Sequence, residues 1–387
     1  MNISGSYLTI NLKNLEHNLK VIKSKLNAKC KIIPVVKANG YGSDSIIIAK
    51  KLVELGVERI AVATFNEALI LKKSGIKISI MIFYPNFKNV NLIIKENFEI
   101  VIYSKHLFEI VSKKINKLKI KSYPVHLKFN SGFNRLGLEK TEIKFILNSN
   151  KIKSIDILSI YSHLGCSENK RPCKYTDKQI ELFDELIKDL SKLIRPRLGF
   201  HLLNTSGVFN YPKKQYDSVR IGLGLYGYSN NFMWDKELKP VFELKSPIIQ
   251  IRKVSKGKYV GYDFGHKTEK DSIIACVPIG HADGINRNFG RKDINVLVNN
   301  KKCSIIGNIC MDILMIDVTN VVCKTGDFVY IFGPKNSASK ISKKAGTISY
   351  ELLSGISNRI IRKIIYWYQF VLFITLLVKT NFISTEI

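Results

Sequence analysis

The sequence predicts an α/β protein in which a closed (β/α)8 barrel of the TIM type is followed by a mainly antiparallel β domain. Three observations lead to this prediction. Short β-branched runs alternate with helix-like stretches as far as Gly227. After Gly227, short apolar runs follow one another with turn residues and no long helix between them. The 387 residues also exceed one ordinary domain of about 100–200 residues.

The first part of the chain contains eight candidate strands, each a short apolar run. They are Lys31–Lys37, Ile60–Ala63, Ile78–Ile82, Ile100–Tyr103, Val125–Phe129, Ile155–Ser162, Phe200–Asn204 and Ser218–Ile221. Helix-like patterns accompany them at Leu12–Leu26, Ser45–Leu55, Asn66–Ser74 and Asp177–Leu193. In the first of these, Leu15, Leu19 and Ile22 recur at helical spacing. Eight strands with intervening helices fit a closed barrel better than an open sheet.

The second part reads as a β domain. Its candidate strands are Val241–Val254, Tyr259–Tyr262, Ser272–Val277, Ile294–Val298, Cys303–Ile306, Ile313–Asp317 and Phe328–Phe332. We therefore expect a barrel over residues 1–230, with the option that its first strand joins the β domain, and a β domain over residues 231–362. The segment Tyr228–Lys239 forms the boundary.

Residues 363–387 form an apolar tail whose role the sequence leaves open. The run Ile364–Val378 is apolar apart from Gln369 and Thr375, with basic residues on both sides. A membrane-spanning helix needs about 20 such residues, so this run is too short. Association with a membrane surface is one alternative, supported by Trp367 and Tyr368. We favour a buried terminal element or an aberrant read-through extension.

Composition narrows the classes of partner. Lys and Arg number 61 against 31 Asp and Glu, for a formal net charge of +30, but the basic residues are scattered from Lys13 to Lys379. No basic arm or aromatic-basic pattern indicates nucleic-acid binding. The seven cysteines show neither C-x-x-C spacing nor a zinc pattern with histidine, so we expect no metal. Reduced thiols and the lack of a signal-peptide pattern favour the cytoplasm.

Two local motifs suggest chemistry. In PVVKANGYG, Lys37 follows the first barrel strand, where apolar neighbours lower the pKa of an amine and favour its neutral, nucleophilic form. In SVRIGLGLYG, glycines follow the eighth strand, where backbone amides can approach a phosphate. An imine-forming lysine after strand 1 and a phosphate loop after strand 8 together point to pyridoxal phosphate.

The order of eight motifs then resembles the alanine racemase family over Leu8 to about Arg362. The motifs are PVVKANGYG, HLKFNSGFNRLG, SHLG, HLLNTSG, RIGLGLYG, PIGHADG, GNICMD and TISYELL. The resemblance implies an isomerase that uses pyridoxal 5'-phosphate to interconvert L-alanine and D-alanine. It further implies a cytoplasmic supply of D-alanine for peptidoglycan, and a homodimer whose sites are completed by the partner's β domain.

The resemblance also assigns roles to residues of the motifs. Lys37 matches the lysine that holds the cofactor and serves as the base on one face of the substrate. His201 matches a residue that lies behind the cofactor contacts and supports them without touching the cofactor. The other expected cofactor contacts are Tyr41, Thr205, Gly222, Leu223 and Tyr350 at the phosphate, and His163 and Asn204 at the ring.

Arg220 matches the arginine that faces the pyridine nitrogen of the cofactor. Because an arginine is always charged, it donates a hydrogen bond and keeps this nitrogen unprotonated, which weakens the ring as an electron sink and disfavours transamination. Arg135 and Met311 match substrate-binding positions. Lys128 matches a lysine that is often carbamylated in the family, and Asn130 stands where an acidic residue is common.

One position departs from the family. The second base is a tyrosine in a G-Y-A-D-G segment, and here the segment is Gly280–Gly284 with His281 in that place. Racemisation needs proton donors on two opposite faces of Cα. A histidine has a reference pKa of about 6.5 against about 10 for tyrosine, and its ring is shorter. His281 therefore serves as the second base with help from water or a shifted backbone, or the enzyme is impaired and exchanges a proton on one face, or the change is a lesion in a decaying gene. We favour the first interpretation.

Overall fold

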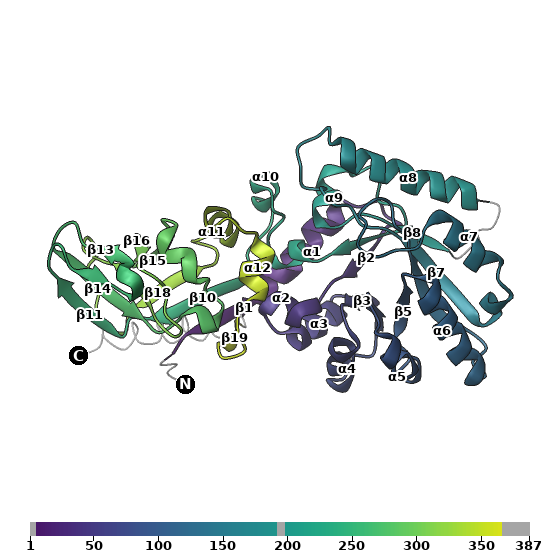
Figure 1. The fold of residues 1–387 in the computed structure, drawn as a ribbon, viewed down its shortest axis with the longest axis horizontal. Helices are drawn as coiled ribbons and strands as arrows, with labels where there is room; N and C mark the ends of the chain where they lie inside the picture. Colours follow the sequence, from purple (N-terminus) through teal and green to yellow (C-terminus); the bar gives the residue numbers. More distant parts are fainter. Residues whose placement is uncertain (1–4, 192–197, 366–387) are drawn as a thin grey trace, which may run out of the picture. The chain divides into compact units, whose positions relative to one another are not determined.

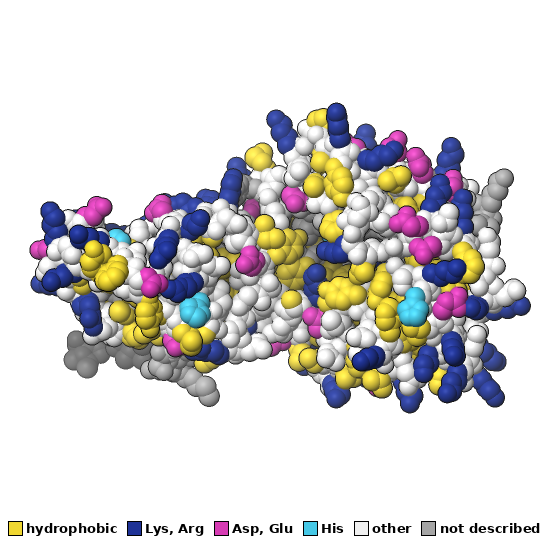
Figure 2. Space-filling model, in the orientation of Figure 1, with side chains coloured by type: hydrophobic (Ala, Val, Ile, Leu, Met, Phe, Trp, Pro, Cys, Tyr) yellow, Lys and Arg dark blue, Asp and Glu magenta, His cyan; other side chains and the backbone are white. Residues whose placement is uncertain are grey.

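The protein is described from a computed structural model that covers residues 5–191 and 198–365. Contacts divide the chain into two compact units, with one division between Leu15 and Glu16 and the other between Lys239 and Pro240. The larger unit holds the barrel strands, and the other holds the β sheet (Figure 1). Figure 2 shows Lys and Arg side chains spread over both units on the side in view, in agreement with the scattered basic residues of the sequence.

Eight parallel strands form the barrel. In sequence order they are β2 (Lys31–Pro34), β3 (Arg59–Val62), β4 (Ser79–Ile82), β5 (Glu99–Ile102), β6 (Tyr123–Lys128), β7 (Ile155–Tyr161), β8 (Gly199–His201) and β9 (Ser218–Ile221). Their order in the sheet is β2-β9-β8-β7-β6-β5-β4-β3. A parallel bridge between Val35 and Ala61 joins the two ends of this order, with Val36 N donating to Ala61 O at 2.9 Å. The ring is therefore nearly closed.

Helices follow the strands because amphipathic segments can bury one face against a sheet. In α6 the buried face is built from Leu107, Phe108, Val111 and Ile115. The helices associated with the barrel are α1 (Leu12–Ser24), α2 (Lys37–Gly42), α3 (Ser45–Glu54), α4 (Phe65–Lys73), α5 (Val90–Lys95), α6 (Lys105–Lys117), α7 (Lys140–Asn148), α8 (Lys174–Leu190), α9 (Thr205–Asn210) and α10 (Phe232–Asp235).

The other unit is a nine-stranded, mainly antiparallel sheet. Its strands are β1 (Tyr7–Asn11), β10 (Phe242–Pro247), β11 (Gln250–Val254), β14 (Ser272–Val277), β15 (Asn295–Val298), β16 (Lys301–Ile306), β17 (Leu314–Asp317), β18 (Phe328–Phe332) and β19 (Ile361–Ile365). The order is β11-β14-β17-β16-β15-β18-β10-β1-β19. The unit also contains the hairpin β12 (Tyr259–Val260) and β13 (His266–Lys267), and the helices α11 (Ala338–Ala345) and α12 (Ser349–Ser354). The predicted fold class, a barrel followed by a mainly antiparallel β domain, is confirmed.

Strand β1 lies inside the nine-stranded sheet of the smaller unit, which we call the second unit or the β unit. It pairs antiparallel with β10 and parallel with β19, so the two ends of the described chain are neighbours. Leu8, Thr9 and Ile10 are all buried, as expected for a strand that is covered on both faces. The first strand of the chain is therefore held by partners that lie more than 200 residues away in sequence.

Several predicted element boundaries are wrong. The predicted strand Lys31–Lys37 ends as β2 at Pro34, because a tight turn begins at Lys37. The predicted strand Val241–Val254 is two strands, β10 and β11. The predicted strand Phe200–Asn204 is shorter because Asn204 caps α9 instead.

The predicted apolar tail lies almost wholly outside the described residues, which end with β19 at Ile365. Within the described part of the chain, none of the helices has the length and apolar character that crossing a membrane requires.

The pairing of β1 predicts a stability effect. Ile10 is fully buried, so Ile10→Ala should destabilise the protein by about 2–5 kcal/mol through lost burial and a residual cavity. Ile361, on the neighbouring strand β19, is 53% exposed, and Ile361→Ala should change stability by no more than about 0.5 kcal/mol. Urea denaturation of both variants measures this difference, and equal effects would contradict the placement of β1.

Candidate active site

Lys37 begins an unusual turn at the carboxyl end of β2. Ala38, Asn39 and Tyr41 have φ angles of 52°, 51° and 57°, so the chain makes one left-handed turn. For residues other than glycine this conformation costs about 1–2 kcal/mol each. Such strain persists only where the surroundings fix it, and it is often found at functional sites.

Glu67 supplies much of this support. Its Oε1 accepts a hydrogen bond from Ala38 N at 2.8 Å, and its Oε2 accepts from Ala63 N at 2.7 Å and Thr64 N at 3.2 Å. One carboxylate thus ties the turn after β2 to the turn after β3. The sequence analysis missed Glu67, although the T-x-x-E spacing of Thr64 and Glu67 is the signal of a helix capping box.

The barrel gathers cations around Lys37. Burial and then the charge of the neighbouring Arg135 lower the pKa of Lys37 below its usual value, and Glu67 opposes this shift only in part. Lys128, at the end of β6, is buried, and burial together with Arg135, Arg220 and Lys37 lowers its pKa to about 8. A cluster with so much positive charge favours anionic ligands and neutral amines.

Arg220 lies at the centre of this region and is 4% exposed. Its NH1 donates to His201 Nδ1 at 2.7 Å, and its NH2 donates to Ser162 O at 2.5 Å and Leu202 O at 2.9 Å. Burial lowers the pKa of Arg220 to about 10, which still leaves the guanidinium charged at neutral pH. The hydrogen bonds to described residues leave from NH1 and NH2, so Nε remains able to donate to another acceptor.

His163 follows β7 and is partly buried. Its Nδ1 lies 3.4 Å from Arg220 NH2, and its ring meets Phe133 edge-on with 5.6 Å between the ring centres. Burial, followed by the charge of Arg220, lowers the pKa of His163 well below its usual value. The ring is therefore a neutral imidazole beside the guanidinium.

A close backbone approach marks the carboxyl end of β9. A Cβ added to Gly222 would lie 2.1 Å from the hydroxyl oxygen of Tyr41, so only glycine lets the tyrosine reach this point. Thr205 Oγ1 accepts from Gly224 N at 3.1 Å, and Leu223 between the two glycines is buried. The predicted phosphate contacts of the barrel therefore lie together.

Asn204, which we predict to lie near the cofactor ring, also makes two local hydrogen bonds. Its Oδ1 accepts from Gly207 N at 2.9 Å and from Ser167 Oγ at 2.8 Å. The first bond caps α9, and the second ties the loop after β7 to it. Both bonds fix the segment that carries Thr205.

Arg135 lies on the loop that follows β6 and is exposed. Its guanidinium stacks on the ring of Phe133 at 4.4 Å. Asn130 Oδ1 accepts from Asn134 N at 3.0 Å, and Asn130 Nδ2 donates to Glu139 Oε1 at 3.0 Å. The side-chain amide of Asn130 thus holds this loop together by hydrogen bonds. An acidic residue is common at this position in the family that the motifs resemble.

The second unit holds the remaining predicted residues. His281 is exposed in the short 3-10 helix His281–Asp283, and its backbone N donates to Cys310 O at 3.0 Å. A Cβ on Gly280 would lie 2.3 Å from Met311 O, so the two loops pack backbone to backbone. Met311 is exposed, and Tyr350 lies on α12. The structure therefore brings His281 and Met311 together.

Arg359 fixes these two loops and was missed by the sequence analysis. Its NH2 donates to Asp312 at 2.7 Å, and its Nε lies 3.4 Å from the buried carboxylate of Asp283. Asp283 also accepts from Gly280 N at 2.9 Å. No local sequence motif predicts this role of Arg359, because its two partners lie 47 and 76 residues earlier in the chain.

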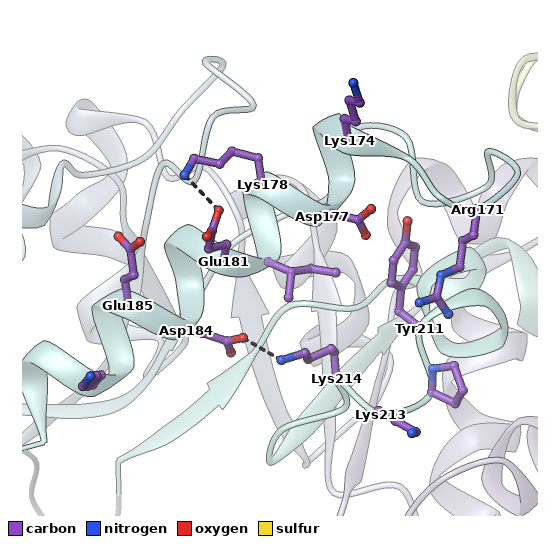
Figure 3. Close-up of a pocket in the computed structure, with 13 residues that line it drawn as sticks. Arg171, Lys174, Asp177, Lys178, Glu181, Asp184, Glu185, Tyr211, Lys213 and Lys214 are labelled. Atoms are coloured by element: carbon purple, nitrogen blue, oxygen red, sulfur yellow. Dashed lines mark hydrogen bonds and ion pairs between the residues drawn. The ribbon is translucent and has the colours of Figure 1, made fainter.

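A groove of the barrel unit lies elsewhere. It has a volume of about 1020 Å³ and lies between α8 and the segment Tyr211–Lys214 (Figure 3). Its lining includes none of the predicted site residues. Several of its charges are paired, as in Lys178 with Glu181 and Lys214 with Asp184. We therefore place the candidate site at the strand ends and not in this groove.

Comparison with known proteins identifies the family. The family model described as "Alanine racemase, N-terminal domain" matches residues 10–230, and "Alanine racemase, C-terminal domain" matches residues 241–364. The chain belongs to the alanine racemase family. This confirms the resemblance seen in the motifs, and the family is generally dependent on pyridoxal phosphate.

Individual alanine racemases support the same conclusion. The chain is 33% identical over 368 residues to the alanine racemase of Treponema denticola, with 91% of this chain and 96% of that protein covered. It is 35% identical over 368 residues to that of Clostridium tetani, with 91% and 93% covered. The solved structure of the alanine racemase of Clostridium difficile 630 superposes with a TM-score of 0.85 at 30% identity, with 94% and 96% covered.

The barrel residues fit the chemistry of pyridoxal phosphate. At Gly222 the hydroxyl of Tyr41 occupies the place that any Cβ would take, and we call this close approach the Gly222 cradle. Arg220 offers a charged donor for a ring nitrogen, and Lys37 offers an amine with a lowered pKa. Each functional part of the cofactor thus finds a matching group in one unit.

The cradle predicts the behaviour of Gly222→Ala. The added methyl group must displace the Tyr41 hydroxyl, which removes one hydrogen bond to a charged group and should weaken pyridoxal phosphate binding about tenfold. Fluorescence titration of the apoprotein with pyridoxal phosphate measures this. The matched control is Gly199→Ala on β8, where the new Cβ would meet Leu158 O at an ordinary 3.5 Å. Equal affinities in the two variants would contradict the cradle.

Proposed function

We propose that this protein is a pyridoxal-phosphate-dependent alanine racemase that interconverts L-alanine and D-alanine. The observation that carries the proposal is the grouping of Lys37, Arg220 and the Gly222 cradle in one unit, in a chain of this family. We further propose that it supplies D-alanine for peptidoglycan in the cytoplasm, the role that the resemblance to the alanine racemase family implies.

The cofactor would be held by the barrel residues already described, with Tyr41, Thr205, Gly222 and Leu223 at its phosphate and His163 and Asn204 near its ring. Tyr350 would add a further contact at the phosphate. When bound, pyridoxal phosphate supplies an aldehyde carbon for amines and a conjugated ring that acidifies the Cα–H bond.

Arg220 limits how far the ring withdraws electrons. The guanidinium can only donate, so it holds an acceptor nitrogen without giving up a proton to it. Its pKa of about 10 keeps the charge in place at neutral pH. The residue therefore favours brief deprotonation at Cα followed by reprotonation, and opposes transamination.

Lys37 and His281 would move the proton. The lowered pKa of Lys37 increases the neutral fraction of its Nζ, which can accept a proton at one face of the substrate. The imidazole of His281 would donate and accept at the other face. Arg135 would hold the substrate carboxylate, and Met311 would contact the substrate from the loop that carries the Cys310 carbonyl.

Lys128 is a candidate for carbamylation. Its pKa of about 8 leaves a sizeable fraction of the amine neutral at neutral pH, and this is the form that adds to carbon dioxide. The carbamate would place a negative charge beside Arg135 and relieve the repulsion among the surrounding cations.

A second copy of the chain would complete each site. The β unit exposes Tyr262, Phe264 and Met311 at 63%, 76% and 59% of their surface, which is unusual for large apolar side chains. These side chains support a homodimer in which the β unit of one copy meets the barrel of the other. A protein that remained monomeric at all concentrations would contradict this part of the proposal.

The activity predicts formation of D-alanine from L-alanine. Purified protein with pyridoxal phosphate should produce D-alanine until the two isomers are nearly equal, and Lys37→Ala should lower this rate by at least about 10³-fold because one base is lost. Chiral chromatography of the reaction measures both. Absence of D-alanine above the Lys37→Ala background would contradict the proposal.

The geometry of the second base predicts the effect of His281→Tyr. A phenol reaches further than an imidazole and restores the group that the family uses, so turnover should rise, by up to about 10² where the misplacement of the base is near 1 Å. Measured kcat values of the two proteins decide this. Unchanged or lower turnover would show that His281 is already well placed.

A further inference from the structure

A row of buried polar side chains crosses the inside of the barrel. Five neighbouring strands, β5 to β9, contribute one side chain each: Glu99, His126, Ser159, His201 and Arg220. None of the five is more than 6% exposed. Buried polar side chains require hydrogen-bond partners, and here the partners are one another.

Four hydrogen bonds join the row from end to end. Arg220 NH1 lies 2.7 Å from His201 Nδ1, and His201 Nε2 lies 2.8 Å from Ser159 Oγ. Ser159 Oγ lies 2.7 Å from His126 Nδ1, and His126 Nε2 lies 3.0 Å from Glu99 Oε2. We call this row the Glu99–Arg220 chain.

The donors and acceptors favour one direction for every bond. Arg220 has no acceptor atom, so it donates to His201 Nδ1, and the proton of this ring lies on Nε2. His201 Nε2–H donates to Ser159, whose hydroxyl then donates to His126 Nδ1. The proton of His126 therefore lies on Nε2 and is donated to the carboxylate of Glu99. The chain runs one way, from the guanidinium to the carboxylate, through two neutral rings.

One other arrangement fits the same distances. If Ser159 accepted from both rings, His126 would be a doubly protonated imidazolium, and the Ser159 hydroxyl would need a further acceptor. No such acceptor is bonded to Ser159 within residues 5–191 and 198–365. The one-way arrangement uses every donor.

The two ends of the chain carry opposite charges. Arg59 Nε and NH2 donate to Glu99 at 2.7 and 2.9 Å. Burial alone would raise the pKa of Glu99, but the hydrogen bonds from His126 and Arg59, together with the charge of Arg59, outweigh it and lower this pKa. At the other end, the described side chains that touch Arg220 are neutral: the rings of His201 and His163, and the face of Tyr161 at 4.7 Å. Tyr161 also stacks on His201 at 4.8 Å and 3°, which fixes the plane of that ring.

We propose that Glu99 is the distant counter-charge of Arg220, and that Glu99, His126 and Ser159 are positioning residues that hold this guanidinium through His201. Aligned hydrogen bonds polarise one another, by about 10–30% per bond, so the carboxylate makes His201 Nδ1 a better acceptor for Arg220. The consequence for catalysis rests on the proposed function, in which Arg220 faces the ring nitrogen of the cofactor.

Nitrogen NMR of the full-length protein with ¹⁵N-labelled histidine tests the direction of the chain. It is recorded on the protein as purified and again after removal of the cofactor, so this readout does not depend on racemase activity. We expect both His126 and His201 as neutral rings with the proton on Nε2. A doubly protonated His126, or a proton on Nδ1 of either ring, would overturn the one-way chain.

Substitution of Glu99 tests whether its charge reaches Arg220. Glu99→Gln keeps an acceptor for His126 but removes the charge, so the Nδ1 resonance of His201 should shift although two residues separate them. The shift should vanish when Ser159→Ala is combined with it, since the chain is then interrupted. Glu96→Gln, which removes a partly exposed carboxylate paired with Lys72, is the matched control and should leave the resonance unmoved. No shift in Glu99→Gln would overturn the proposal.

Ser159→Ala provides a second test if Glu99→Gln folds poorly. In the loaded enzyme, kcat should fall about tenfold with KM nearly unchanged, because the chain touches Arg220 and not the substrate. The control Ser112→Ala removes another buried hydroxyl, which donates to Phe108 O in α6, and should retain the parent kcat. Equal kcat in the two variants would overturn the proposal. A protein without racemase activity that shows the expected NMR pattern would contradict only the proposed function.

Discussion

The burial of one guanidinium constrains much of the barrel. Arg220 is surrounded by acceptors from the ends of β7 and β8, namely the carbonyls of Ser162, His201 and Leu202 and the rings of His201 and His163. Because a charge away from water is costly unless every donor is matched, these strand ends and rings must stay in place together. The same matching fixes which nitrogen of each histidine carries a proton, so the electrostatics of the site follow from the packing of three strands.

The cations around Arg220 give the site its selectivity for anions. Burial and the charge of Arg135 lower the pKa of Lys37, and Glu67 is the carboxylate that opposes this shift. Burial, followed by the charges of Arg135, Arg220 and Lys37, lowers the pKa of Lys128. A phosphate and a carboxylate are the ligands that such a region binds well, and an amine with a lowered pKa is the base that proton abstraction needs. Glu67 also connects this charge to the strained left-handed turn after β2. Its carboxylate accepts a hydrogen bond from the turn and lies close enough to Lys37 to stabilise the charged amine.

The sequence predicted the features that depend on local pattern. The alternation of apolar runs and helix-like stretches predicted the eight barrel strands. The motifs around Lys37 and Gly222 come directly after predicted strands in the sequence, so their place at the strand ends was predictable as well. Partners distant in sequence were not predictable: Glu99 and His126 are 27 residues apart, and β1 pairs with β19 across nearly the whole chain. Asn204 was expected in a strand because its neighbours are apolar, but its side chain caps α9 instead. The pattern of apolar residues does not show when a side chain will hydrogen-bond to the backbone and so end a strand.

The central claim is that a charged Arg220 faces the cofactor and keeps its ring nitrogen free of a proton. Nitrogen NMR of the protein reconstituted with pyridoxal phosphate labelled with ¹⁵N in the ring tests this claim most directly. We predict the resonance of an unprotonated, hydrogen-bonded pyridine at neutral pH. The resonance of a pyridinium under the same conditions would contradict the account.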